Sequence, residues 1–432
     1  MSRYGRRTIR WLPAVTAVLL ATVATTVAQA GIKNHHTGSE HFDSFPPPAW
    51  FNFYRDWGTK AKAVTDDGHN APGALSVGGD VGTPQLPLSS DQLIMTEFWH
   101  KGGPVTVNWR HPMAASADWT RGVRFARTTS LSGRTYFTGS LSNPAIIDDV
   151  SINLVDDQPF IDWADDLYAQ LGRQVRLNEE SKNFPQRMPR TAAALHSGQT
   201  INTVMLGDSI VNDTYRSLWD ILVEQHYPEA NLQLQLSVEG GKGAWWYAEE
   251  GQNRVQSYVL NKLTADQHNV VLIGGISHNA DEQAYGEVID EILAFDAANP
   301  EYSLEILVAT GTAGADASQN LPFAIPPNNE GAAHNLYVGF RDRLRLLAED
   351  RGVGFLDARG SYNDFVQNHG QPYSYFRRDL VHMNHRGEQI TARIFESYFM
   401  APEPSAVVLM ALGGLGLVKR TGGRRRRRPS HG

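Results

Sequence analysis

The stretch Thr203-Val-Met-Leu-Gly-Asp-Ser-Ile-Val-Asn-Asp213 decides the fold of the second half of this chain. An apolar run stops abruptly at Gly207, Asp208 and Ser209. Glycine removes the steric bar to a tight turn, and residues that follow a strand of an open α/β sheet lie at its ligand-binding edge. We therefore predict a strand, a turn that carries Ser209, and a helix whose N-terminus directs the Ser209 N–H at an anion.

The surrounding sequence alternates strand and helix signals in a regular way. The expected strands are 203–206, 232–238, 270–273, 304–310 and 353–357, and the expected helices are 215–227, 254–263, 283–298, 333–350 and 387–399. Strands joined by helices indicate a parallel sheet that is covered on both faces.

The first half of the chain has a different pattern. Short patches with β character are separated by Gly, Pro, Asn and Ser clusters, at 104–110, 122–127, 134–140 and 149–155. They predict a smaller, mostly β accessory region over 31–185, with a helix near 161–171. A connector with two prolines at 182–190 places the boundary near residue 185. The many aromatic residues of this region suit either core packing, which is the favoured interpretation, or stacking on sugar rings.

A second functional signal lies far downstream, in the stretch RRDLVHMNHRGEQITARIF at 377–395. Asp379 and His382 are three residues apart and precede an expected helix. A serine hydroxyl is a weak nucleophile at neutral pH and needs a base, which a carboxylate orients. Ser209, His382 and Asp379 are therefore the candidate nucleophile, base and orienting acid.

Two stretches, LHSGQTINTVMLGDSI (195–210) and DLVHMNHRGEQI (379–390), resemble the first and last blocks of the SGNH hydrolases, also called GDSL esterases and lipases. The resemblance covers residues 191–399. It implies a flavodoxin-like three-layer α/β/α domain over 186–400 and a Ser-His-Asp acyl-enzyme mechanism on carboxylic ester bonds. That mechanism needs no metal and no organic cofactor.

The two middle blocks of the family match less closely. The second supplies a glycine N–H to the oxyanion hole, and VEGGKGAWW (238–246) fits with Gly243, with Gly241 as the alternative. In another interpretation these glycines only form a turn. The third block normally reads Gly-x-Asn-Asp, but here the sequence is LIGGISHNAD (272–281). The expected oxyanion donors are the N–H groups of Ser209 and Gly243 with either Asn279 or Ser277.

Both end segments indicate export. Residues 1–30 combine a basic start, an apolar core and a small-x-small ending at Ala30, as in a cleaved secretory signal; an uncleaved anchor is the alternative. Residues 401–432 contain Pro402-Glu403-Pro404, a short apolar run and an arginine-rich end, and they resemble the PEP-CTERM sorting signal of Gram-negative bacteria. This implies transient membrane insertion, an exosortase-type processing enzyme and delivery to the cell surface or matrix. An ordinary anchor is the alternative.

The remaining 31–401 span carries 28 basic and 45 acidic residues, a net charge of −17. Such a surface repels phosphate backbones, so we expect no nucleic-acid partner. The chain has no cysteine, so its stability depends on packed cores and not on disulfides.

Three functions fit these observations. The favoured one is an exported ester hydrolase that removes acetyl or other acyl groups from a carbohydrate, so that its partner is an acylated glycan or a small ester. The alternatives are a polysaccharide O-acyltransferase with the same triad and a non-catalytic extracellular matrix protein. The sequence does not distinguish water from sugar as the acyl acceptor.

Overall fold

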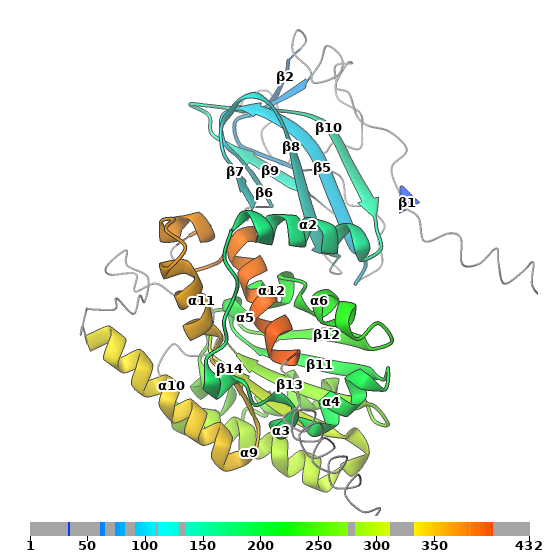
Figure 1. The fold of residues 1–432 in the computed structure, drawn as a ribbon, viewed down its shortest axis with the longest axis vertical. Helices are drawn as coiled ribbons and strands as arrows, with labels where there is room; N and C mark the ends of the chain where they lie inside the picture. Colours follow the sequence, from blue (N-terminus) through cyan, green and yellow to red (C-terminus); the bar gives the residue numbers. More distant parts are fainter. Residues whose placement is uncertain are drawn as a thin grey trace, which may run out of the picture. The chain divides into compact units, whose positions relative to one another are not determined.

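The structure is a computed structural model that describes residues 33–34, 61–64, 74–82, 91–108, 111–128, 135–274, 281–311, 332–379 and 381–400 (Figure 1). The expected signal segment and sorting tail lie outside these residues. The chain divides into two compact units, Met1–Trp163 and Ala164–Gly432. Among the described residues, no helix combines the length and apolarity that crossing a bilayer requires.

The first unit contains two antiparallel sheets, with strand orders β2-β3-β10-β5-β8 (β1 pairs with β10) and β4-β9-β6-β7. Their strands are β1 (Lys33–Asn34), β2 (Ala61–Val64), β3 (Ala74–Val77), β4 (Asp80–Gly82), β5 (Leu93–Gly102), β6 (Val105–Val107), β7 (His111–Met113), β8 (Ser116–Arg127), β9 (Tyr136–Gly139) and β10 (Ala145–Leu154). The predicted mostly β region is confirmed. The long strand β5 lies outside the predicted patches.

Side chains from both sheets of the first unit form one apolar cluster. Phe98 of β5 and Phe137 of β9 meet edge to face, with ring centroids 5.0 Å apart. Within this unit, Phe160 at the start of α2 (Gln158–Gln170) packs on Phe125. Phe98 is therefore a core residue, as favoured, whereas Trp99 and Trp119 are half-buried.

The second unit is built on a parallel sheet with the order β12-β11-β13-β14-β15. Its strands are β11 (Thr200–Gly207), β12 (Asn231–Val238), β13 (His268–Gly274), β14 (Leu304–Ala309) and β15 (Gly354–Leu356). All five predicted strands are confirmed with shifted ends. The order 2-1-3-4-5 is the flavodoxin-like one, in which the chain reverses its direction of growth beside the first strand. Ser209 follows that strand and so lies at the switch point.

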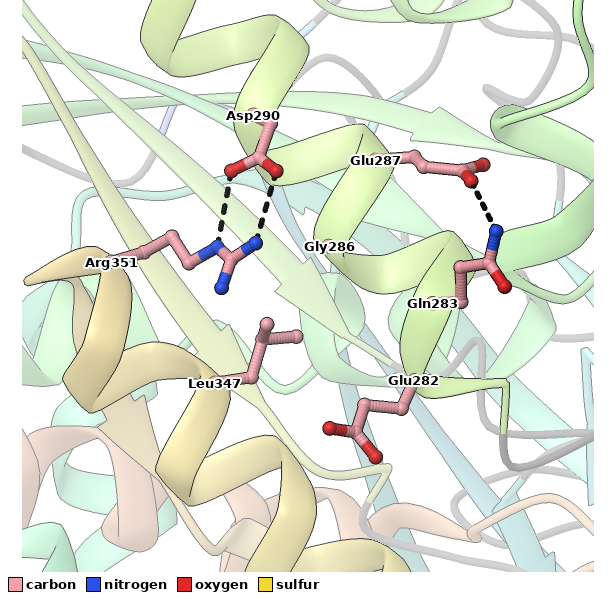
Figure 2. Close-up of a pocket in the computed structure, with 7 residues that line it drawn as sticks. All are labelled: Glu282, Gln283, Gly286, Glu287, Asp290, Leu347 and Arg351. Atoms are coloured by element: carbon pink, nitrogen blue, oxygen red, sulfur yellow. Dashed lines mark hydrogen bonds and ion pairs between the residues drawn. The ribbon is translucent and has the colours of Figure 1, made fainter.

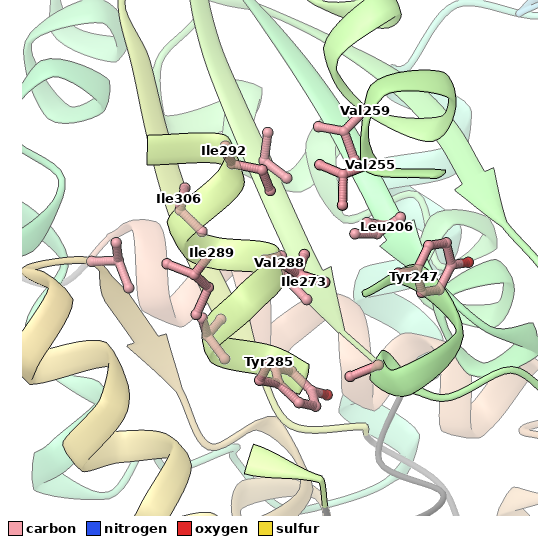
Figure 3. Packing of buried hydrophobic residues seen from close by; sticks show 14 of the residues in the cluster. Leu206, Tyr247, Val255, Val259, Ile273, Tyr285, Val288, Ile289, Ile292 and Ile306 are labelled. Carbon is pink, nitrogen blue, oxygen red and sulfur yellow. The ribbon is translucent and has the colours of Figure 1, made fainter. Parts of the chain in front are cut away.

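Helices cover the parallel sheet. They are η1 (Glu179–Ser181), α3 (Phe184–Arg187), α4 (Pro189–His196), α5 (Ser209–Arg216), α6 (Trp219–His226), α7 (Ala244–Tyr247), α8 (Arg254–Tyr258), η2 (Leu260–Lys262), α9 (Glu282–Ala298), η3 (Pro300–Tyr302), α10 (Ala332–Arg351), α11 (Ala358–Gln367), η4 (Tyr373–Phe376) and α12 (His385–Phe399). One core joins the sheet to α7–α10, where Leu206, Ile273 and Ile306 meet Val288 and Ile292 of α9 (Figure 3). Elsewhere, α6 and α12 pack together through aromatic rings.

Two predicted helices are interrupted. The expected helix over 215–227 is wrong as a single element, because Leu218 adopts a left-handed backbone (φ 57°) between α5 and α6. The Ser217 hydroxyl donates to the Thr214 carbonyl at 2.6 Å and so helps to end α5. The expected helix over 254–263 likewise breaks into α8 and η2 at Val259.

The division between the units falls inside α2, before the boundary that was predicted near residue 185. The residues that follow α2 belong to the second unit and form hydrogen bonds with residues in the C-terminal half of that unit. Arg173 pairs with Asp364 at 2.9 Å, and the Asn178 amide donates to Asp357 at 2.9 Å. The proline-containing connector is therefore part of the α/β unit, a placement that depends on these long-range hydrogen bonds.

Candidate active site

The turn that carries Ser209 is tightly enclosed. A Cβ on Gly207 would lie 2.1 Å from the Gly274 carbonyl oxygen of the neighbouring strand, so only glycine fits there. The buried Asp208 caps α5, because its Oδ1 accepts the Ile210 N–H at 2.8 Å. Ser209 thereby becomes the first residue of α5, and its own N–H has no carbonyl acceptor within the helix. The predicted strand, turn and helix are confirmed.

The structure brings the three candidate triad residues together. His382 and Asp379 lie in the segment between η4 and α12, and His382 is 173 residues after Ser209. His382 Nε2 is 2.9 Å from Ser209 Oγ, and His382 Nδ1 is 2.9 Å from Asp379 Oδ2. These distances connect hydroxyl, imidazole and carboxylate in the order that a serine nucleophile requires. The second unit alone supplies all three.

The Asp379 carboxylate is held by its own loop. Its Oδ1 accepts the N–H groups of Val381 and His382, each at 2.7 Å. Burial raises the pKa of the Asp379 carboxyl, but these hydrogen bonds and the His382 ring outweigh it and hold the pKa below its usual range. An ionised Asp379 fixes the proton of His382 on Nδ1, which leaves Nε2 to accept the Ser209 proton. The His382 side chain is 25% exposed, so a substrate can reach it.

The other motif residues of this loop position it on α12. The Asn384 side chain caps the helix by accepting the Arg386 N–H at 2.9 Å and donates to the Tyr375 carbonyl at 2.9 Å. A Cβ on Gly387 would lie 2.4 Å from the Phe376 carbonyl oxygen. The Asn and Gly that follow the histidine in the sequence therefore fix where the loop meets its helix.

Tyr247 ties the loop after β12 to the nucleophile strand. Its hydroxyl donates to the Gly207 carbonyl at 2.5 Å and accepts the Glu239 N–H at 3.1 Å. Burial raises the pKa of this hydroxyl, so it remains a donor at neutral pH. Sequence reasoning missed Tyr247, because an aromatic residue in AWWY gives no sign that it bonds to a distant strand.

Gly243 and Gly241 differ in backbone conformation. Gly243 is extended and buried, directly before α7, and its role as an oxyanion donor stays a prediction. Gly241 has a φ of 70°, in the left-handed region that favours glycine, so its backbone conformation alone explains a glycine at this position. Trp245, which lies on α7 two residues before Tyr247, is 40% exposed.

The third predicted donor falls in a segment outside the described residues. Both Asn279 and Ser277 lie in 275–280. Gly274, which precedes this segment, pairs with Gly207 at the end of the nucleophile strand. The segment therefore starts at the edge of the sheet that carries Ser209, and the choice between the two donors stays a prediction.

Two surface cavities of the second unit have linings that do not include the triad. One, of about 420 Å³, lies between α9 and α10 and is lined mainly by charged residues, with Arg351 directed at Asp290 and Gln283 at Glu287 (Figure 2). Arg351 bonds to both Asp290 oxygens at 3.1 Å. The other, of about 430 Å³, lies beside α7 and α8. Within the lining of the first cavity, the Arg351–Asp290 pair joins the two helices, whereas Gln283 and Glu287 both belong to α9 and Glu282 pairs with Arg343, which lies outside the lining.

The sequence matches no protein family and no curated protein sequence. Solved structures resemble parts of it at low identity. A two-domain esterase active on acetylated mannans, crystallised with mannopentaose, is 14% identical over 57% of this chain, with a TM-score of 0.35; the match spans only 56% of that esterase. A protein from Bacillus subtilis is 14% identical over 82% of this chain and 88% of its own (TM-score 0.32). A variant of an acetyl-xylooligosaccharide esterase from Geobacillus is 14% identical over 47% and 94% (TM-score 0.35).

Proposed function

We propose that this protein is a serine ester hydrolase of the SGNH type. The observation that carries the proposal is the continuous chain of contacts from Ser209 Oγ through His382 to Asp379, at 2.9 Å in both steps. The two matching sequence blocks support it, because each supplies part of this chain of contacts. A non-catalytic matrix protein would not require such an arrangement.

In the proposed mechanism, Ser209 Oγ attacks the ester carbonyl carbon as its proton moves to His382 Nε2. The carbonyl π electrons move to oxygen, and the N–H groups of Ser209 and Gly243 stabilise this oxyanion together with Asn279 or Ser277. His382 then protonates the leaving alcohol oxygen as its bond to the acyl carbon breaks. A water molecule, deprotonated by His382, then attacks the acyl carbon of the acyl-enzyme and forms a second tetrahedral intermediate. When this intermediate breaks its bond to Ser209 Oγ, the acid is released and His382 returns the proton to Ser209.

The proposed substrate is an acylated carbohydrate. Trp245 is 40% exposed and supports this choice, because an exposed tryptophan is a residue type that stacks on sugar rings. It lies two residues after Gly243, the proposed oxyanion donor, in the chain. The high acidic charge of the 31–401 span suits a neutral glycan better than a polyanion.

Acetate release from acetyl-xylan tests the proposal. We expect the wild-type protein to release acetate and Ser209→Ala to lose activity by about 10⁶-fold while its circular dichroism is unchanged. The same reaction with a free xylo-oligosaccharide acceptor separates hydrolysis from acyl transfer, because a transferase acetylates the acceptor. Equal activity of Ser209→Ala and wild type would eliminate the assigned nucleophile.

We further propose that the protein is exported and processed at both ends, on the strength of residues 1–30 and 401–432. Proline lacks a backbone donor, so Pro402 and Pro404 favour an extended junction that a processing enzyme can bind. The apolar run 406–418 would cover about 20 Å as a helix, less than the roughly 30 Å of hydrocarbon. Intact-mass analysis of surface-extracted protein should show loss of the tail. A retained polyarginine end would instead indicate a membrane-anchored esterase.

A further inference from the structure

Asp213 connects the nucleophile helix to the triad loop. It lies one helical turn after Ser209 on α5 and is fully buried. Its Oδ1 accepts a hydrogen bond from the Arg378 guanidinium at 3.0 Å, and its Oδ2 accepts the Met383 N–H at 3.0 Å. These two partners flank the 379–382 segment on either side. One side chain of α5 therefore holds both ends of the segment that carries the base and the acid.

Arg378 connects the two ends of this loop by hydrogen bonds. Its backbone N–H donates to the His382 carbonyl at 3.1 Å, and its guanidinium also donates to the Met383 carbonyl. The same guanidinium has its Nε 3.9 Å from Asp379 Oδ2. Its side chain is only 13% exposed. The cation thus lies within 4.0 Å of the carboxylates of Asp213, Asp379 and Glu388, and it links the nucleophile helix to the triad loop.

The strength of these contacts follows from burial and charge. Hydrogen bonds between ionised groups are roughly twice as strong as neutral ones, and removing one partner of a buried pair leaves the other charge uncompensated. Displacing a catalytic group by about 1 Å costs on the order of a hundredfold in rate. A change at Asp213 would be transmitted to His382 through the loop backbone, because Met383 is the next residue.

We propose that Asp213 and Arg378 are positioning residues that set the distance between Ser209 Oγ and His382 Nε2. Neither takes a proton from the substrate nor contacts the reacting carbonyl in the proposed mechanism. This inference rests on the proposed esterase function for its kinetic consequence, but its geometric content concerns only the triad. It assigns to Asp213 a role that no sequence motif indicated.

The kinetic test uses Asp213→Asn and Arg378→Met, with Arg378→Lys as the conservative variant. Asp290→Asn is the matched control, because it breaks an Asp–Arg pair of the same chemistry on α9 and α10, where the Arg351 and Asp290 side chains are 29% and 54% exposed.

For Asp213→Asn and Arg378→Met, we expect kcat on p-nitrophenyl acetate, per site titrated with a phosphonate ester, to fall about 10- to 100-fold, with KM changed by less than about threefold. Arg378→Lys should recover part of the loss, and Asp290→Asn should have no effect. Unchanged kcat per titrated site in Asp213→Asn, even with a lowered Tm, would overturn the proposal.

A second measurement does not depend on turnover. The Nδ1–H of His382 is hydrogen-bonded to Asp379 and should give a low-field proton resonance, identified by its loss in His382→Ala. We expect Asp213→Asn to shift or broaden this resonance and Asp290→Asn to leave it unchanged. If the wild-type protein cleaves no ester, the proposed function fails, but this resonance still decides the positioning role. An identical resonance in Asp213→Asn would contradict it.

Discussion

Two connections that follow neighbouring strands of the parallel sheet differ in how far their residues are buried. In the turn after β11, Asp208 is buried and Ser209 is directed at its base by an enclosed backbone that only glycine permits at position 207. In the loop after β12, Trp245 is 40% exposed. Tyr247 anchors this second loop, because it belongs to the same buried cluster as Leu206 (Figure 3).

The difference follows the needs of the two proposed tasks. Proton transfer between Ser209 and His382 requires a heavy-atom distance within hydrogen-bond reach, so its loop must be rigid. Stacking on a sugar tolerates small displacements, so an exposed side chain such as Trp245 suffices. Substitutions in the first loop and its partners should therefore act on kcat, and substitutions in the exposed part of the second loop on KM.

Among the substitutions that test this comparison, the largest effect is expected for Asp379→Asn. An amide at this position presents a donor to His382 Nδ1 and so favours the tautomer with the proton on Nε2, which cannot accept the Ser209 proton. We expect kcat to fall about 10⁴-fold, with little change in KM or Tm. Steady-state kinetics on p-nitrophenyl acetate together with thermal melting measure this. Activity within about tenfold of wild type would mean that Asp379 does not orient the base.

Asn279→Ala and Ser277→Ala extend the comparison to the segment after β13. A true oxyanion donor acts mainly in the transition state, so its loss should lower kcat about 100-fold and leave KM nearly unchanged. We expect one variant to show this and the other to behave like wild type. If both variants keep kcat within about tenfold, this segment supplies no donor and the oxyanion hole depends on Ser209 and Gly243.

Tyr247→Phe tests the anchor of the second loop. It removes the hydrogen bond to the Gly207 carbonyl and leaves the Glu239 N–H without this acceptor, so unfolding free energy should drop by about 1–3 kcal/mol. A less constrained Gly243 should lower kcat by roughly tenfold. Tyr258→Phe is the matched control, because its hydroxyl bonds to the Glu239 side chain and not to the strand. Equal kcat for both variants would separate the anchor from catalysis.

The smallest effect is expected for Trp245→Ala. Loss of the aromatic face should raise KM for acetylated xylo-oligosaccharides by about 2- to 10-fold and leave kcat and the hydrolysis of ethyl acetate unchanged. Leu346→Ala, at another exposed apolar residue, should change neither. An equal loss on ethyl acetate would show that Trp245 supports the oxyanion loop and does not bind sugar.

Four strands of the second unit could be predicted because each contains a short apolar run that is buried in the covered sheet. The edge strand β12 could be predicted from the alternation of its apolar and polar residues. Its helices were harder to delimit. The break at Leu218 depends on a left-handed backbone at an ordinary apolar residue, which no propensity indicates. Strand β5 of the first unit was missed because Glu97, Trp99 and Lys101 alternate with its buried residues and give it no obvious apolar run.

The sequence by itself determined the α/β class of the second half, the turn at Gly207–Ser209 and the Asp379–His382 pair, because these depend on local periodicity and on short-range geometry. Only the tertiary structure decided that residues 173 positions apart meet at 2.9 Å. It also decided that Tyr247 and Asp213 hold the two halves of the site in place. Those contacts join side chains without local signature, and parallel strands bring their carboxyl ends together only when the whole sheet has formed.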